Sequence, residues 1–262
     1  MDILDQYVTT LPTEQNAIDL FKTEWTSTIP GLESGHAALF EDGRIHWFLD
    51  QIGNHDGYTA LELGPLEAGH TYILEKSKVK SIVSIEANSR AFVKCLIVKN
   101  TLEYRKTHFL LGDFQEYLAH ASNNAFDISI ASGVLYHMQD PATLIKNLCR
   151  VTNKAILLWT HYYDKALLEM NANVVTSKFG DTVGSQFDGV DIELTEFLYQ
   201  SSLEWSGFCG GSKHSAQWLR RQDIMNLFEM YGWEMKAISN DDKLHPHGPA
   251  FTLCFVKKGA QA

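Results

Sequence analysis

Two apolar runs that end in acidic residues constrain the fold of this chain more than any other feature. The first run spans residues 59–63, carries Glu62 near its end and leads into a loop opened by Gly64. The second run spans residues 81–86 and ends at Glu86. A parallel strand followed by a glycine turn and a helix N-terminus is typical of nucleotide-binding sheets, and an acid that ends the next strand can accept hydrogen bonds from ribose hydroxyls. The pair therefore predicts a binding site for an adenosine-containing ligand.

Strand-like and helix-like segments alternate from about residue 59 to 160, which predicts a parallel sheet covered by helices. The expected strands span residues 59–63, 81–86, 107–111, 126–131 and 154–160, and the expected helices span residues 69–76, 89–99, 115–121 and 142–150. The last of these helices has the strongest signals, because Asp140 can cap it and Pro141 suits its first position. The predicted fold class is α/β, with a Rossmann-like, doubly wound sheet.

The C-terminal part predicts an antiparallel pair of strands that closes the sheet. A helix is expected near residues 221–231, with Gly232 as its stop. Strand-like runs follow at 233–239 and 251–257, and no helix fits the loop between them. Two successive strands without a crossover helix pair in antiparallel fashion, so we expect this pair at the edge of the sheet.

The segments outside this alternation are expected to cover the core. Residues 1–57 are predicted to form an N-terminal helical segment that packs on the core or forms a lid over it. One helical pattern there runs from residue 18 to 25, and another starts after Asp42 and stops at Gly53. The core domain is predicted to span residues 58–262.

Within that core, residues 161–218 resist a periodic interpretation and are rich in aromatic residues and glycine. Because they follow the fifth strand, we expect an inserted cap over the substrate. The segment 205–218 suits a loop over a substrate, since glycine supplies backbone freedom and aromatic rings supply flat surfaces. An ordinary turn that leads to a helix is the alternative.

The composition disfavours a nucleic-acid partner and a membrane location. The net charge is −10, and the lysines and arginines form no cluster of the kind that binds phosphates. No apolar stretch approaches the ~18 residues that a membrane span needs, and no secretory signal is recognisable. The four cysteines lack metal-ligand spacing. Cys95 and Cys149 in expected helices and Cys254 in an expected strand fit buried thiols in a reducing compartment, so we expect a cytoplasmic location and no metal site.

Two further strand ends carry residue types that suit an adenosine ligand and chemistry beside it. Asp113 and Phe114 follow the third expected strand, where the acid can accept from the exocyclic amine of adenine and the ring can pack on the base. The fourth strand opens into Ser132–Gly133 and then Tyr136–His137. Because reactions in doubly wound sheets take place at the carboxyl ends of strands, these residues are candidates for a reacting centre.

Taken in order, these residues resemble the class I S-adenosylmethionine-dependent methyltransferases. The likeness covers roughly residues 58–160 and, more loosely, the closing antiparallel pair. The run Gly133-Val-Leu-Tyr-His-Met, followed by Asp-Pro, is similar to the motif after strand four in the small-molecule branch. The resemblance implies S-adenosylmethionine as cofactor and a seven-stranded sheet whose last strand is antiparallel. It implies these cofactor-binding residues: Glu62, Gly64, Pro65, Leu66, Gly69, Glu86, Ala87, Asp113, Phe114, Ser132 and Gly133.

By the same resemblance, Glu62 and Gly64 line the methionine end of the cofactor and Glu86 binds the ribose. The loop departs from the family pattern, which commonly has glycines where this chain has Leu66 and Ala68. Either the Leu66 side chain crowds the cofactor, or the loop follows a different path.

A nicotinamide-dependent oxidoreductase is the main competing interpretation of an acid-bearing sheet of this kind. A dinucleotide fingerprint needs Gly-x-Gly-x-x-Gly so that the backbone can approach a pyrophosphate, and this loop lacks the middle glycine. Glu62 also precedes the loop, where it suits a positively charged amino acid end. These two features favour a methyltransferase.

Methyl transfer is an in-line displacement, so the protein mainly aligns the acceptor, excludes water and, for a hydroxyl or amine, removes a proton. His137 is the candidate base, because the pKa of histidine suits physiological pH. Tyr136 and His161 complete the expected catalytic set. The alternatives are that Tyr136 and His137 only wall the cofactor pocket and that His161 is a structural strand end. Arg44 is expected on a solvated helix face, and the alternative is that it reaches the cofactor's carboxylate from a helix that forms a lid.

The predicted function is transfer of a methyl group from S-adenosylmethionine to a small polar molecule or glycan. Two alternatives stay open: an enzyme of the same superfamily that modifies a tRNA wobble base, and a non-catalytic, methyltransferase-like binding protein. The sequence leaves open the acceptor, the atom that is methylated and the oligomeric state.

Overall fold

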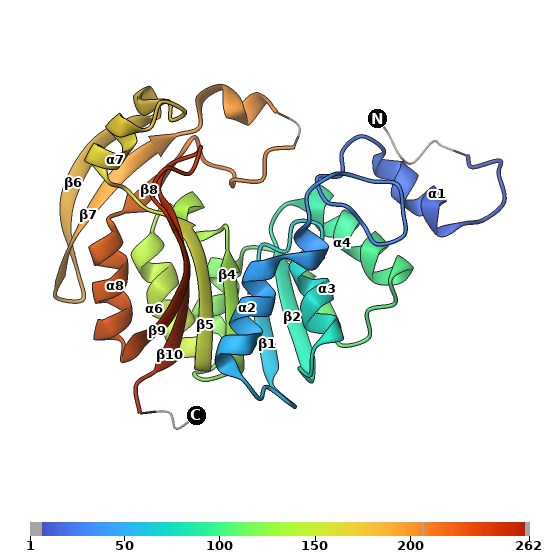
Figure 1. Cartoon of the computed structure of the whole chain (residues 1–262), viewed down its shortest axis with the longest axis horizontal. Helices are drawn as coiled ribbons and strands as arrows, with labels where there is room; N and C mark the ends of the chain where they lie inside the picture. The colour runs from blue at the N-terminus through green and yellow to red at the C-terminus, as the bar shows by residue number, and fades with distance from the viewer. Residues whose placement is uncertain (1–6, 206, 260–262) are drawn as a thin grey trace.

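The computed structural model of the chain describes residues 7–205 and 207–259 and has a central seven-stranded sheet between two layers of helices (Figure 1). The strand order is β3-β2-β1-β4-β5-β10-β9. The strands are β1 (Thr59–Leu63), β2 (Ser81–Glu86), β3 (Thr107–Leu111), β4 (Phe126–Ser132), β5 (Thr152–His161), β9 (Trp233–Asp242) and β10 (Ala250–Lys257). The predicted α/β, doubly wound fold class is confirmed.

The pairing directions bring the carboxyl ends of five strands, β1 to β5, to one edge of the sheet. Strand β1 pairs in parallel with β2 and β4, and β4 pairs in parallel with β5. Strand β10 runs antiparallel to both β5 and β9, so the expected closing pair and the antiparallel last strand are confirmed. Strand β5 exceeds its expected bounds because Thr152 pairs with Phe126 and His161 pairs with Ala250.

The helices cover both faces of this sheet, as the continuous apolar strands require. They are α2 (Gly43–Ile52), α3 (Gly69–Lys76), α4 (Ser89–Thr101), α5 (Phe114–His120), α6 (Pro141–Val151) and α8 (Arg221–Met230). Alternate residues of β5 enter different cores: Ala155 and Leu157 pack in the cluster that contains Ile45 of α2. Ile156 and Leu158 pack in the cluster that contains the apolar residues of α6 and α8.

Local signals set the ends of several helices where the sequence predicted them. The carboxylate of Asp42 accepts from the backbone amide of Arg44 and caps α2, and Asp140 likewise caps α6. Gly53 and Gly232 follow the ends of α2 and α8 with positive φ angles of 67° and 79°.

The N-terminal segment contains less helix than its apolar pattern predicted. Helix α1 (Glu14–Ile18) passes into the 3₁₀ turn η2 (Asp19–Phe21), and Thr23 has a positive φ of 71° that ends the helical path. Trp25 therefore lies outside any helix, and its indole nitrogen donates to the carbonyl of Ile18 at 2.8 Å. Its ring still packs in the same buried cluster as Ile18 and Cys95 of α4.

A second, three-stranded antiparallel sheet follows β5 and was not predicted. Its strands are β6 (Phe179–Phe187), β7 (Val190–Leu198) and β8 (Ser215–Leu219), in that order, after the short helix α7 (Lys165–Met170). Asp188 and Gly189 connect β6 to β7 with φ angles of 47° and 89°. We call residues 162–219 the cap. Figure 1 shows the cap beside the end of the main sheet where β4 and β5 finish.

The predicted domain boundaries, at residue 57/58 and at 161–218 for the insertion, remain predictions. Among the described helices, none is long and apolar enough to cross a membrane.

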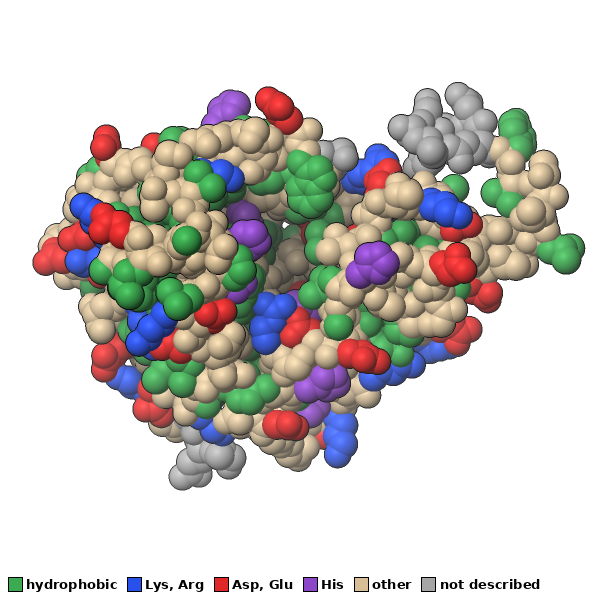
Figure 2. All heavy atoms as spheres, turned by 45° about the horizontal axis from the view of Figure 1, so that its top comes forward, with side chains coloured by type: hydrophobic (Ala, Val, Ile, Leu, Met, Phe, Trp, Pro, Cys, Tyr) green, Lys and Arg blue, Asp and Glu red, His purple; other side chains and the backbone are tan. Residues whose placement is uncertain are grey.

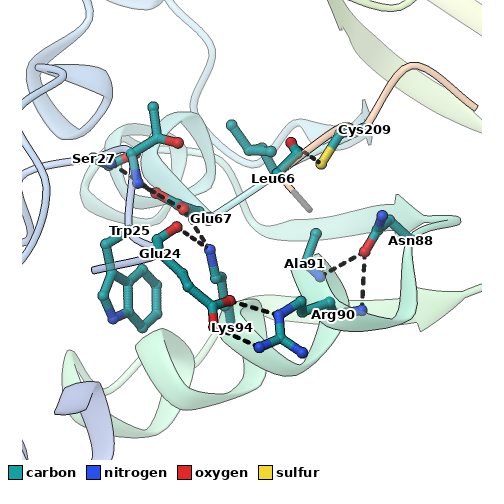
Figure 3. Close-up of polar contacts among 12 residues, drawn as sticks. Glu24, Trp25, Ser27, Leu66, Glu67, Asn88, Arg90, Ala91, Lys94 and Cys209 are labelled. Carbon is teal, nitrogen blue, oxygen red and sulfur yellow. Dashed lines mark hydrogen bonds and ion pairs between the residues drawn. The ribbon is translucent and has the colours of Figure 1, made fainter. Parts of the chain in front are cut away.

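One buried carboxylate joins the N-terminal segment to the loop between β1 and α3 (Figure 3). Glu67 lies in that loop and is 1% exposed. It accepts from the ammonium of Lys94 on α4 at 2.9 Å, and from the backbone amides of Thr26 at 2.9 Å and Ser27 at 2.8 Å. Lys94 also donates to the carbonyl of Glu24. Two elements far apart in the sequence are thus held on the loop that follows β1.

Replacing Glu67 with glutamine is expected to lower the free energy of unfolding by about 3–5 kcal/mol, because the ammonium of Lys94 would stay buried without its carboxylate. Urea denaturation followed by tryptophan fluorescence measures this change. The matched control is Glu169→Gln, which removes the partner of Lys165 in an exposed pair and should change stability by less than about 1 kcal/mol. Equal effects of the two substitutions would contradict the role given to Glu67.

Candidate functional site

The candidate site lies where β1, β2, β4 and β5 end. Figure 2 shows the surface hollowed between the part that carries the cap and the part that carries the N-terminal segment, with histidine and basic side chains beside the hollow. A cavity of about 170 Å³ is lined by Leu66 and Asn88 of the core, by Lys94, and by Trp205 and Cys209 of the cap. Core loops and cap therefore face the same space.

Glu62, near the end of β1, is buried to 1% exposure. Its Oε2 atom accepts from the hydroxyls of Thr71 at 2.5 Å and Ser84 at 2.6 Å. Its Oε1 atom is buried and has no hydrogen-bond partner among the described residues. Burial raises the pKa of this carboxyl above its ordinary value. An unpaired buried acceptor of this kind is unfavourable unless a ligand supplies a donor.

The loop after β1 has positive φ angles at Gly64 and at the two positions, Leu66 and Ala68, where the family commonly has glycine. The φ angles are 65° at Gly64, 55° at Leu66 and 62° at Ala68. Leu66 and Ala68 thus hold the conformation that ordinarily favours glycine. A side chain at Gly64 would not fit, since its Cβ would lie 2.8 Å from Cγ1 of Val134. Pro65, between Gly64 and Leu66, is buried.

Gly69 begins α3, and a Cβ there would lie 2.7 Å from the carbonyl carbon of Leu39. The glycine thus permits a close approach of the N-terminal segment to the start of α3.

Glu86 at the end of β2 links this loop to the start of α4. It is 7% exposed and accepts from the backbone amides of Leu66 at 3.1 Å and Asn88 at 2.8 Å. Burial raises its pKa, and these two hydrogen bonds oppose the shift. Ala87, between Glu86 and Asn88, is exposed. A carboxylate has about four acceptor positions, so Glu86 keeps capacity for ligand hydroxyls.

Asp113 and Phe114 occupy the turn after β3. The carboxylate of Asp113 accepts from the backbone amide of Gln115 at 2.7 Å and caps α5. Phe114 is 8% exposed and packs with Leu118 in the main core. The structure thus gives both residues a role in starting α5, and their predicted contacts with adenine remain predictions.

Ser132 and Gly133 at the end of β4 lie beside β5. Ser132 is half-buried, and the amide of Gly133 donates to the carbonyl of Trp159 at 3.0 Å. Gly133 has a φ of 84°, and a Cβ at this position would lie 3.4 Å from the Trp159 ring. The end of β4 is therefore held against β5 beside the tryptophan.

Tyr136, His137 and His161 lie close together, and their predicted catalytic roles remain predictions. The ring centroid of Tyr136 lies 4.1 Å from that of His137 and 4.6 Å from that of His161. Trp218 of β8 stacks on His161 at 5.2 Å with an interplanar angle of 6°. His245, in the loop between β9 and β10, lies 4.9 Å from His161 on another side. We call these five residues the aromatic wall.

Burial sets the protonation of the aromatic wall. It lowers the pKa of His137 and of His161 to about 4, and it raises the pKa of Tyr136 to about 12. Both imidazoles are therefore neutral at physiological pH, and the phenol keeps its proton. The Nδ1 atom of His161 contacts the carbonyl of Gly248 at 2.9 Å, so it carries the ring proton and Nε2 keeps a lone pair.

Arg44 lies at the site rather than on a solvated helix face, which corrects the sequence-based expectation. Its guanidinium carbon stands 4.7 Å from the centroid of the Trp159 ring, and its side chain is 25% exposed. Asp42, the cap of α2, binds both Arg44 and, at 2.8 Å, the Nε2 atom of His70. Sequence periodicity alone could not show this, because the packing of α2 on β5 brings Arg44 over Trp159.

Sequence reasoning also missed Tyr199, whose hydroxyl lies 2.7 Å from Nδ1 of His137. Trp218 falls at the end of the segment 205–218, and His245 falls in the loop expected between the two closing strands, and neither was a candidate site residue. Within residues 7–205 and 207–259, no group of three or more His, Cys, Asp or Glu side chains is arranged to hold a metal ion.

Comparisons with known proteins agree with this geometry. The sequence profile of a methyltransferase domain matches residues 54–227, which is more than half of the chain. No curated protein sequence matches the chain.

Several solved structures share the fold. The N-terminal domain of EvdMO1, crystallised in the presence of S-adenosylhomocysteine and D-fucose, has a TM-score of 0.65 and 19% identity over 94% of both chains. Magnesium protoporphyrin IX methyltransferase from Synechocystis PCC 6803, with bound S-adenosylhomocysteine, has a TM-score of 0.53 and 13% identity over 82% of this chain and 80% of its own. The 1,6-didemethyltoxoflavin-N1-methyltransferase from Burkholderia thailandensis has a TM-score of 0.54 and 8% identity over 84% of this chain and 79% of its own.

The pKa of His161 predicts a loss of stability in mild acid. The unfolded chain takes up this proton near pH 6.5, whereas the folded chain takes it up near pH 4. As pH falls from about 6.5 to 4, the unfolded state therefore binds more protons, and His161 should remove on the order of 3 kcal/mol from the free energy of unfolding. Urea denaturation at pH 7 and pH 4.5 should show a smaller pH dependence for His161→Gln. The exposed His120→Gln control should keep the dependence of the parent chain, and an equal dependence in all three proteins would contradict the assignment.

Proposed function

Because the chain belongs to the methyltransferase-domain family and is an S-adenosylmethionine-dependent methyltransferase, we propose that it methylates a hydroxyl group of a small polar acceptor. The single observation that carries this proposal is the meeting of Tyr136, His137 and His161 at the ends of β4 and β5, beside the cap. Two neutral imidazoles offer acceptor nitrogens, and such nitrogens suit an acceptor molecule that brings hydroxyl protons.

The residues around the loop after β1 fit S-adenosylmethionine. The unpaired Oε1 atom of Glu62 suits the positively charged amine of the methionine end. Gly64 opens the loop with the left-handed backbone that favours glycine, and Glu86 at the end of β2 keeps acceptor capacity for ribose hydroxyls. These residues would hold the cofactor, which when bound supplies an electrophilic methyl group.

The aromatic wall supports a sugar or another flat-faced, hydroxyl-bearing molecule as the acceptor. The ring of Tyr136 is only half-buried and offers an apolar surface, and the neutral imidazole of His137 beside it offers a polar atom. Rings with a few placed polar groups are typical of small-molecule sites. The crystallisation of EvdMO1 with D-fucose adds support for this acceptor class.

In this proposal His137 accepts the proton of the acceptor hydroxyl. Its lowered pKa keeps the imidazole neutral, so it is ready to take a proton at physiological pH. The phenol of Tyr136 remains protonated and can donate a hydrogen bond to the acceptor. The buried rings of His161 and Trp218 exclude water from the wall, and the guanidinium of Arg44 over Trp159 adds positive charge beside it.

Isothermal titration with S-adenosylmethionine, S-adenosylhomocysteine and NAD, followed by transfer of a labelled methyl group to a panel of acceptors, tests the proposal. The panel contains monosaccharides, including D-fucose, together with phenols, amines and carboxylic acids. Binding of the first two ligands alone and labelling of a hydroxyl acceptor are expected. Labelling confined to amines or carboxylic acids would contradict it.

Replacing Glu86 with alanine should weaken binding of S-adenosylhomocysteine at least about tenfold, since a hydrogen bond to a charged group contributes about 1.5–3 kcal/mol. Because Glu86 also binds the amide of Leu66, the decisive measurement compares this ligand with its 2′-deoxy analogue. The parent protein should prefer the ribose form and the variant should not. A preserved preference would refute the ribose assignment, and Glu116→Ala, in α5, serves as control.

Replacing His137 with alanine should lower turnover by ~10²-fold or more while leaving cofactor affinity nearly unchanged, because the side chain is assigned to proton transfer. Steady-state rates with the acceptor labelled most strongly in the panel measure the first effect, and calorimetry measures the second. The His120→Ala control should retain full activity. Undiminished turnover in the His137 variant would show that this residue only lines the pocket and does not transfer the proton.

A further inference from the structure

We infer that Tyr199 of the cap is a positioning residue that holds His137 in the tautomer with its proton on Nδ1. This inference rests on the proposed function, in which Nε2 of His137 accepts the proton of the acceptor. It adds a specific task to the cap: the cap fixes which nitrogen of the base is free.

Tyr199 is well fixed for this task. It follows the last residue of β7, is 3% exposed, and its backbone amide donates to the carbonyl of His214 at 3.1 Å. The rings of Phe197 and Phe208 lie 5.8 Å and 4.8 Å from its own, both in edge-on arrangements. Ring contacts and the buried position together restrict the side chain to one orientation.

The tautomer follows from counting protons. The hydroxyl of Tyr199 has one proton, and it donates that proton to the carbonyl of Gly210 at 3.0 Å, since a carbonyl can only accept. The same hydroxyl lies 2.7 Å from Nδ1 of His137. Both contacts are hydrogen bonds only when the hydroxyl accepts in the second one, and in that arrangement Nδ1 carries the ring proton. Nε2 of the neutral ring then keeps its lone pair.

Gly210 makes the arrangement possible. A Cβ at this position would lie 2.9 Å from Nδ1 of His137 and 2.5 Å from Cζ of Phe208. Any larger residue would therefore displace the histidine or the cap loop. The cap is also tied to the 3₁₀ turn after β4 (Leu135–His137) that carries Tyr136 and His137, because the amide of Gln217 in β8 donates to the carbonyl of Met138 at 2.8 Å.

The opposite tautomer would place a proton on Nε2, and that nitrogen could not remove a proton from an acceptor hydroxyl. Loss of the correct tautomer lowers turnover by orders of magnitude in enzymes that use a histidine base. Because Tyr199 and Gly210 belong to the cap, the base is fully prepared only when the cap is docked.

The test uses the full chain saturated with S-adenosylhomocysteine and labelled with ¹⁵N at histidine, so it does not depend on an acceptor. The His137 signals are identified by their loss in His137→Gln. In the parent protein Nδ1 should show the protonated chemical shift and Nε2 the unprotonated shift. In Tyr199→Phe the population should move toward the tautomer with the proton on Nε2. Turnover with the acceptor labelled most strongly in the panel should fall ~10²-fold, with cofactor affinity unchanged.

The matched control is Tyr231→Phe, which removes a hydroxyl that bonds Asp188 at 2.7 Å on the molecular surface. It should change neither tautomer nor turnover. Gly210→Ala disturbs the same contact by a different route, because its Cβ would press on the His137 ring. It should shift the tautomer as Tyr199→Phe does. In the double variant His137→Ala/Tyr199→Phe, turnover should equal that of His137→Ala alone.

An unchanged tautomer in Tyr199→Phe would overturn the inference, and so would a changed tautomer with undiminished turnover. A further loss of turnover in the double variant would also overturn it, since Tyr199 would then act apart from His137. Full activity of His137→Ala would instead refute the proposed base, a result that is distinguishable because the tautomer is read directly from the spectrum.

Discussion

The buried ion pair of Glu67 and Lys94 is the interaction on which the site depends. One carboxylate receives an ammonium from α4 and backbone amides from the N-terminal segment, so three separate parts of the chain meet at the loop after β1. A buried charge strongly resists separation from its partner, and the loop is therefore held in place on both sides. The backbone amide of Leu66, the neighbour of Glu67, donates a hydrogen bond to Glu86, so the loop is also fixed to the end of β2.

The side chains assigned to cofactor binding and to proton transfer are buried, which disfavours their charged forms. Burial raises the pKa of Glu62 and Glu86 and lowers that of His137 and His161. Each group thus loses solvation of its charged form, which works against folding. Perturbed groups of this kind gather at functional sites because a ligand or a proton transfer needs them there. Burial of these groups at the carboxyl edge of the sheet therefore lowers stability. The ion pair of Glu67 and Lys94 offsets this by holding the loop after β1 in place.

Sequence reasoning succeeded for the main sheet and failed for parts of its surroundings. The glycine pattern marked Leu66 and Ala68 as a departure, yet both adopt positive φ angles, because neighbouring contacts such as the hydrogen bond from Tyr104 to the carbonyl of Ala68 hold the loop. The cap sheet had a usable signal, since Asp-Gly is typical of a tight hairpin turn and the residues after it alternate, with apolar side chains at Val190, Ile192 and Leu194. Arg44 had no such signal, because its position over Trp159 results from how α2 packs on β5.

By itself the sequence determined the order and type of the core elements, the antiparallel closing pair and the strand ends that carry Glu62, Glu86 and His137. These features follow from apolar runs, helix caps and glycine stops, which act within a few residues and so can be recognised locally. Only the tertiary structure decided which side chains complete the site. Tyr199 and His137 are 62 positions apart, and their contact depends on the path of the whole cap and on the room left by Gly210. No local pattern encodes such a distance, because it is set by the packing of one layer on another.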